Sequence, residues 1–156
     1  MKIVFLTISS KLPGWVDEVA GDYQKKLSFW IPTELKVLPA PSLDREAKDK
    51  KLKLESEKLS AFLKDDDFVL LCDERGKSLS SLEFAKKFES ILNSGKKRIV
   101  VIIGGSYGVD ATIKARANFT IGLSPFTLNH HMALAVTFEQ IYRAMTILKG
   151  TQYHNG

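Results

Sequence analysis

The residues best suited to chemistry in this sequence gather in its last third, after a strongly apolar run. The motif GGSYG at positions 104–108 directly follows the β-branched run 99–103. Glycines at a strand end lack side chains, so backbone amides can approach a small ligand closely. The motif is a weak match to a dinucleotide fingerprint, because it follows the fourth apolar run rather than the first. On its own it fits a tight turn between a strand and a helix equally well.

Two further segments place polar or flexible residues at the ends of apolar runs. The sequence CDERGK at 72–77 follows one run, and the loop LSPFTL at 123–128 follows another. In a parallel sheet the carboxyl ends of the strands line one crevice, so both segments are predicted to meet the glycine motif there. The residues at 73–75 could contact a ligand or form a solvated turn with ion pairs, and the solvated turn is the commoner outcome. Cys72 is predicted to be a buried small apolar residue, because nothing near it would activate a thiolate.

Three residues near the C-terminus have side chains that could act on a substrate. Arg143 lies in an otherwise apolar helical pattern, where a cation needs a carboxylate, a phosphate or access to solvent. Glu139 precedes it by one helical turn, so a purely structural ion pair is a second explanation. Tyr153 and His154 follow Gly150, a predicted helix stop, and form a short polar tail.

Apolar runs alternate with helical patterns along the whole chain, and this alternation indicates the fold class. Strands are predicted at 2–8, 33–38, 68–72, 99–103 and 119–123. Helices are predicted from Pro13 through Leu27, from Ser80 or Ser81 to about Asn93, and at 43–63, 109–117 and 127–148. The pattern predicts one α/β domain over residues 1–156, with a mostly parallel sheet flanked by helices on both faces.

The composition is that of an ordinary globular domain with a modest positive charge. The 156 residues carry 23 basic and 18 acidic side chains, a net charge of +5, which is compatible with RNA binding without establishing it. The single cysteine excludes an internal disulfide and favours a reducing cytoplasm. No apolar run approaches the ~20 residues that cross a membrane. No metal site is predicted, because no cysteine or carboxylate completes a ligand spacing with the adjacent His130 and His131.

The predicted last helix, 127–148, is apolar on nearly every side. A helix of this kind has to be covered all round. Two explanations remain open at this point: the helix contacts a second copy of the chain, or it lies in the centre of the core.

Taken in order, these segments resemble the bacterial 23S ribosomal RNA (pseudouridine-N3)-methyltransferases, a branch of the SPOUT or α/β-knot superfamily. The resemblance runs almost end to end and rests on KIVFLTISSKLPGWVDEVAGDYQKKL, DERGKSLSSLEFA, IGGSYGV, LSPFTLNH, EQIYRA and the final YH. The ordered set is specific, although no single motif is. Two positions depart from the usual pattern of the family. Asn129 replaces a proline or another small loop residue, and Leu134 replaces an arginine.

The resemblance implies a C-terminal trefoil knot, a homodimer and S-adenosylmethionine as the methyl donor. The donor would be bound by Leu71, Cys72, Gly104, Gly105, Leu123, Ser124, Pro125, Phe126, Thr127 and Leu128. The substrate would be N3 of a pseudouridine in 23S rRNA, within the large subunit or the whole ribosome.

The resemblance also implies that the catalytic residues are Arg143, Tyr153 and His154. His154 would act as a base or an orienter, and Tyr153 would stack on or position the reacting base. Arg143 would hold a phosphate or stabilise negative charge on a uracil oxygen. Leu134 keeps two alternatives open, a knotted RNA-binding protein without transfer activity and another SPOUT RNA methyltransferase. A flavodoxin-like nucleotide binder without RNA is a more distant alternative.

Overall fold

Strands and helices alternate through the computed structural model, which describes residues 1–43 and 47–156. The strands are β1 Lys2–Ile8, β2 Thr33–Leu38, β3 Phe68–Ser78, β4 Arg98–Ile103 and β5 Phe119–Gly122. The helices are α1 Gly14–Ser28, α2 Lys48–Phe62, α3 Ser81–Leu92, α4 Ala111–Arg116 and α5 His130–Lys149. Apart from its boundaries, the predicted series of elements is confirmed.

All five strands pair in parallel in the order β2-β1-β4-β3-β5. The central strands β1 and β4 run in register from Lys2 beside Arg98 to Thr7 beside Ile103. Both faces of these strands are covered, so their sequences are almost continuously apolar rather than alternating. The carboxyl ends of β3, β4 and β5 consequently lie at one edge of the sheet.

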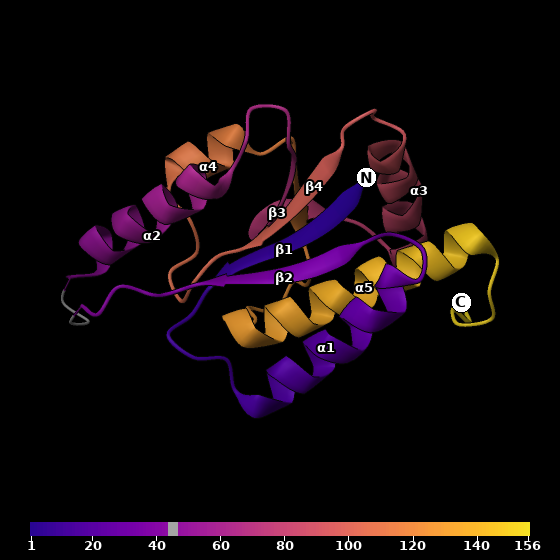
Figure 1. The fold of residues 1–156 in the computed structure, drawn as a ribbon, viewed down its shortest axis with the longest axis horizontal. Coiled ribbons are helices and arrows are strands. Elements are labelled where there is room, and N and C mark those ends of the chain that lie inside the picture. Colours follow the sequence, from indigo (N-terminus) through magenta and orange to yellow (C-terminus); the bar gives the residue numbers. More distant parts are fainter. Residues whose placement is uncertain (44–46) are drawn as a thin grey trace.

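Helices cover both faces of the sheet, as Figure 1 shows. α1, α3 and α5 pack on one face, where Phe5 of β1 stacks on Phe138 of α5 with ring centroids 3.7 Å apart. α2 packs on the other face through Leu59, and α4 packs there through Ile113. The predicted α/β class, with a parallel sheet between two layers of helices, is confirmed. The order of the strands does not establish how the chain is threaded, so the trefoil knot stays a prediction.

Capping residues set the helix boundaries near the predicted site. Ser80 and Glu83 form a reciprocal capping box at the start of α3. Asn129 caps α5, because its Oδ1 accepts a hydrogen bond of 2.8 Å from the N–H of His131. Asn129, which departs from the usual family pattern, thus has a local role as a helix cap. The helix begins at 130 instead of the predicted 127. Gly150 ends α5 in the left-handed conformation at φ 69°, as predicted.

The prediction of a charged turn after Cys72 is wrong, because β3 continues to Ser78. β5 pairs with β3 in two separate stretches, with Ile121 opposite Cys72 in the first and opposite Lys77 in the second. The irregular segment between the stretches brings Gly76 so close to β5 that a Cβ atom would lie 2.5 Å from the carbonyl carbon of Ile121. Local sequence pointed to a turn because the segment is polar, whereas backbone pairing with β5 keeps it extended.

The predicted helix 43–63 is confirmed over Lys48–Phe62, and its part at 44–46 falls outside the described residues. Three positions of this helix are buried. Leu59 packs on the sheet, and the other two are the polar residues Glu55 and Ser56. The polar pair indicates that α2 also packs against the loop after β4, where Glu55 lies beside Gly105 and Ser56 bonds to Asp110.

Candidate active site

The middle of β3 and the loops that follow β4 and β5 enclose a cavity of about 640 Å³, called here the donor cavity. Eight of the ten predicted donor-binding residues line it: Cys72, Gly104, Gly105, Leu123, Ser124, Phe126, Thr127 and Leu128. The other two do not. Leu71 is fully buried against α2 and α4, and Pro125 is exposed outside the lining. The volume is within the range of small-molecule sites.

Packing within the protein requires glycine at both Gly104 and Gly105 of the turn. A Cβ atom on Gly104 would stand 2.7 Å from the carbonyl oxygen of Gly108, and one on Gly105 would collide with the carboxylate of Glu55. Gly108 has φ 76° and its N–H donates to the oxygen of Gly105 at 3.0 Å. The turn thus needs glycine because of its own packing, and not only because a ligand approaches it.

Charged side chains of both signs surround the donor cavity. Lys48, Arg75 and Lys114 line it together with Asp73 and Glu74. Asp73 lies 4.0 Å from Lys114, and its side chain is only 14% exposed. Glu74 accepts a hydrogen bond of 3.3 Å from the hydroxyl of Thr127, which ties β3 to the loop after β5. The cavity therefore offers separate partners to a ligand that carries both a cation and an anion.

His130 contributes a neutral ring to the same cavity. Burial lowers the pKa of His130, and the nearby His131 and Lys51 lower it further. Two lysines of α2 also contact the ring of Tyr107 in the glycine turn. Lys48 Nζ lies 5.3 Å and Lys51 Nζ 5.7 Å from the centre of this ring. Sequence reasoning missed the contribution of α2, because a charged helix without a motif carried no signal of contact with a distant turn.

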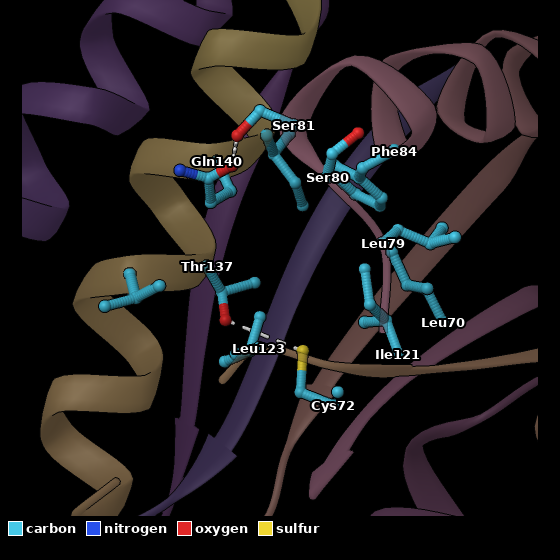
Figure 2. A pocket seen from close by; sticks show the side chains of 13 residues that line it. Leu70, Cys72, Leu79, Ser80, Ser81, Phe84, Ile121, Leu123, Thr137 and Gln140 are labelled. Carbon is cyan, nitrogen blue, oxygen red and sulfur yellow. Dashed lines mark hydrogen bonds between the residues drawn. The ribbon is translucent and has the colours of Figure 1, made fainter. Parts of the chain in front are cut away.

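A second, smaller cavity of about 280 Å³ adjoins the first between β3, β5, α3 and α5. Cys72 and Leu123 line both cavities. Figure 2 shows Thr137 reaching from α5 toward Cys72, at 3.5 Å between Oγ1 and Sγ. Burial raises the pKa of the Cys72 thiol to about 11, so it stays protonated and is no nucleophile. This agrees with the apolar role predicted for the residue.

The C-terminal tail folds back along α5 to Glu139, which lies in the middle of the helix. Glu139 Oε1 accepts hydrogen bonds from Arg143 Nη2 at 2.6 Å and from the Tyr153 hydroxyl at 3.0 Å. Arg143 Nη1 donates to Nδ1 of His154 at 3.1 Å. The structure thus brings the three predicted catalytic residues together, and the predicted ion pair between Arg143 and Glu139 is present as well.

The proton positions in this cluster follow from its partners. Arginine has only donors, so Nδ1 of His154 accepts and the neutral ring carries its proton on Nε2. Burial and hydrogen bonds with Tyr23 and Glu139 raise the pKa of Tyr153, which therefore stays a protonated phenol. In this arrangement the tail presents hydrogen-bond donors rather than a free base.

The tail cluster and the donor cavity are built on different parts of α5. Figure 1 shows the C-terminus beyond the last turn of α5, whereas His130, which lines the cavity, begins the helix. Ala133 is the last residue of α5 in the cavity lining, and Arg143 follows it by ten positions, about 15 Å along the axis at 1.5 Å per residue. Within one chain the tail cluster is therefore separated from the donor cavity along α5.

A family model described as "Predicted SPOUT methyltransferase" matches residues 1–154 of the chain. The chain belongs to the SPOUT methyltransferase family. A ribosomal RNA large subunit methyltransferase H from Bdellovibrio bacteriovorus is 45% identical over 155 residues, covering 99% of both chains. A protein of the same name from Cytophaga hutchinsonii is 34% identical and covers 99% of this chain and 100% of its own length. The resemblance found in the sequence is thus confirmed.

Solved structures extend the match to the fold. A probable methyltransferase from Bordetella pertussis superposes with a TM-score of 0.57 over 92% of this chain and 96% of its own, at 15% identity. This likeness supports the α/β architecture alone. Over residues 1–43 and 47–156, no helix is long and apolar enough to cross a membrane, and no three His, Cys, Asp or Glu side chains gather as metal ligands.

Proposed function

We propose that this SPOUT methyltransferase transfers the methyl group of S-adenosylmethionine to N3 of a pseudouridine in 23S rRNA. The observation that carries the proposal is the 45% identity over nearly the whole chain to a ribosomal RNA large subunit methyltransferase. So small a domain, with a net charge of only +5, has little surface for reading a long RNA sequence. We therefore expect the assembled ribosome in the cytoplasm to be the substrate, with the pseudouridine already formed.

The donor cavity has the shape and chemistry that this donor needs. Its backbone wall at Gly104 and Gly105 and its apolar residues Leu123 and Leu128 suit a flat base and ribose. Asp73 and Glu74 can pair with the ammonium group of the ligand, and Lys48 or Lys114 with its carboxylate. When bound, S-adenosylmethionine supplies an activated methyl group. The residues of the cavity bind it and fix its direction, and alignment dominates the rate of an in-line transfer.

The tail residues would act on the base that receives the methyl group. N3 lies between two carbonyl groups, and loss of its proton to solvent water places negative charge on their oxygens. The Nε2–H of His154 and the guanidinium of Arg143 are donors that can stabilise this charge, and the ring of Tyr153 can stack on or position the base. This role for His154 replaces the role of general base, because Arg143 occupies its Nδ1 acceptor. Glu139 orients the cluster without contacting the substrate.

A two-fold dimer would bring a tail and a donor cavity together. One side of α5 faces away from the sheet and carries Met132, Val136, Glu139 and Arg143 at helical spacing. Antiparallel packing of two α5 helices along this side would place Arg143 of one chain near Met132 of the other. Each active site would then combine one chain's donor cavity with the other chain's tail.

The variant Met132→Lys is predicted to weaken this dimer at least about tenfold, because it places a positive charge beside Arg143 of the partner subunit in the proposed contact. Met132 is 44% exposed in the single chain, so the fold should tolerate the change. Sedimentation at micromolar concentration would measure the dissociation constant. Leu82→Lys is the matched control, since Leu82 is 48% exposed and lies on α3 rather than on α5. An unchanged dimer in Met132→Lys would exclude this side of α5 as the interface.

The decisive experiment incubates the protein with labelled S-adenosylmethionine and ribosomes that lack the N3 methyl group. We expect one methyl group per large subunit, at a pseudouridine located by mass spectrometry of the rRNA digest. Ribosomes with uridine in place of pseudouridine should be poor substrates, because a site built to bond the extra N1 proton rejects the analogue. Binding to ribosomes without any transfer would favour the RNA-binding alternative.

A further inference from the structure

We propose that Glu55 on α2 makes the donor cavity prefer the positively charged methyl donor over the neutral product of the reaction. The inference rests on the proposed function, because it concerns the sulfonium group of S-adenosylmethionine. Methyl transfer leaves both bonding electrons on sulfur, so the sulfonium becomes a neutral thioether while the rest of the molecule is unchanged. Glu55 would be a specificity-determining residue that acts through the cavity wall without touching the ligand.

The carboxylate of Glu55 is buried and incompletely paired. The residue is 1% exposed, and Oε2 has no hydrogen-bond partner among the described residues. Lys51 Nζ lies 3.9 Å from Oε1, which is too far for a hydrogen bond. A buried charge without full compensation costs stability. Such a group is more readily explained by a role at a binding site than by a role in folding.

The carboxylate lies against the glycine turn that forms one wall of the donor cavity. A Cβ atom on Gly105 would collide with Oε2 and would stand 3.1 Å from Cδ of Glu55. Gly105 also lines the cavity, so one backbone unit separates the carboxylate from a bound ligand. The next residue, Ser56, holds the far end of the loop, because its Oγ accepts a hydrogen bond of 3.0 Å from the N–H of Asp110. The position of the charge is therefore fixed relative to the cavity.

Positive charges at the same turn make a compensating carboxylate useful. Lys48 and Lys51 both lie over the ring of Tyr107, and Lys48 also lines the cavity. These ammonium groups would repel a sulfonium. Glu55 lies behind the same turn and offsets that repulsion.

Two opposing effects act on the ionisation of Glu55, and burial is the larger. Burial raises the pKa of its carboxyl group above the ordinary value, and the ammonium groups of Lys51 and Lys58 limit the rise. The ionised form that the proposal requires is supported by these two lysines. At an effective dielectric constant near 20, a carboxylate about 10 Å from a sulfonium strengthens binding by roughly tenfold, and it has no such effect on a thioether.

The test compares the affinities of S-adenosylmethionine and S-adenosylhomocysteine by calorimetry in the wild type, Glu55→Gln and Glu57→Gln. Glu57 is an exposed carboxylate on the same helix and serves as the matched control. We expect Glu55→Gln to lower the preference for the sulfonium by about tenfold, with little change for the thioether, and Glu57→Gln to leave both affinities unchanged. The two ligands share the amino and carboxylate groups, so the ratio reports the charge on sulfur alone.

The ratio of affinities also guards against effects on folding, since both ligands bind the same folded fraction. Glu55→Asp retains the charge but withdraws it by one methylene, and it should give an intermediate ratio. Equal weakening of both ligands in Glu55→Gln would show a purely steric role and overturn the inference, as would an unchanged ratio. If the wild type binds neither ligand, the proposed function itself fails.

Discussion

Removing Tyr153 to Gly156 is expected to lower the rate of methyl transfer by about 10²-fold or more, while S-adenosylmethionine still binds normally. The deletion removes Tyr153 and His154, the two tail residues that we propose act on the base. It leaves the donor cavity intact, because that cavity lies at the other end of α5. Single-turnover transfer to ribosomes would measure the rate, and calorimetry would measure binding of the donor.

Single substitutions separate the contributions of the tail. Tyr153→Phe keeps the ring that lies under the guanidinium of Arg143, 4.7 Å from its centre, but removes the hydroxyl that bonds to Glu139. His154→Gln keeps a side-chain donor and should retain more activity than His154→Ala. Thr151→Ala, in the same tail but outside the cluster, is the control. Full activity of the truncated protein would remove the tail from the mechanism and leave Arg143 as the remaining catalytic candidate.

The variant Gly105→Val is expected to weaken donor binding by at least about 10²-fold. A Cβ at this position would collide with the buried carboxylate of Glu55, so either that side chain or the turn has to shift. The remaining bulk of valine adds to the cavity wall that Gly105 forms, where a ligand has to approach the backbone. Calorimetry with S-adenosylmethionine would measure the loss, and circular dichroism would confirm that the sheet persists. Gly21→Val is the matched control, because nothing lies within 4 Å of a Cβ atom there.

The two inactive variants should restore activity when they are mixed. In a mixed dimer, a chain without its tail still offers an intact donor cavity, and the Gly105→Val chain still offers an intact tail. Random exchange of subunits would regenerate roughly a quarter of the wild-type sites. The mixture would stay inactive if each chain used its own tail, so this outcome would contradict an active site shared between subunits.

The local sequence was sufficient to predict most of the fold. Continuous β-branched runs such as 99–103 predicted strands covered on both faces, and the capping residues Ser80 and Gly150 marked helix ends correctly. These signals are local, because periodicity and caps depend on neighbours within a few positions. The segment 73–78 was misjudged for the same reason. Its polar residues favour a turn, and only pairing with β5 from a distant part of the chain keeps it extended.

The family pattern in the sequence predicted which residues would gather at the candidate site, and eight of ten donor residues line the cavity. It also predicted the cluster at the C-terminus, where Arg143, Tyr153 and His154 meet. The alignment of a motif says which residues share a site, but it does not say which of their atoms are already occupied. His154 is an example, since its contact with Arg143 decides which ring nitrogen carries the proton.

The sequence by itself determined the fold class, the family and most of the residues that line the cavity, because these are recorded in local patterns and in their order along the chain. Only the tertiary structure decided that Glu55 stands behind Gly105 and that the tail folds back onto Glu139 and Arg143. In both cases the contact joins different segments of the chain, α2 with the turn after β4 and the tail with α5. Such contacts arise from how the segments pack, and no local pattern carries that information.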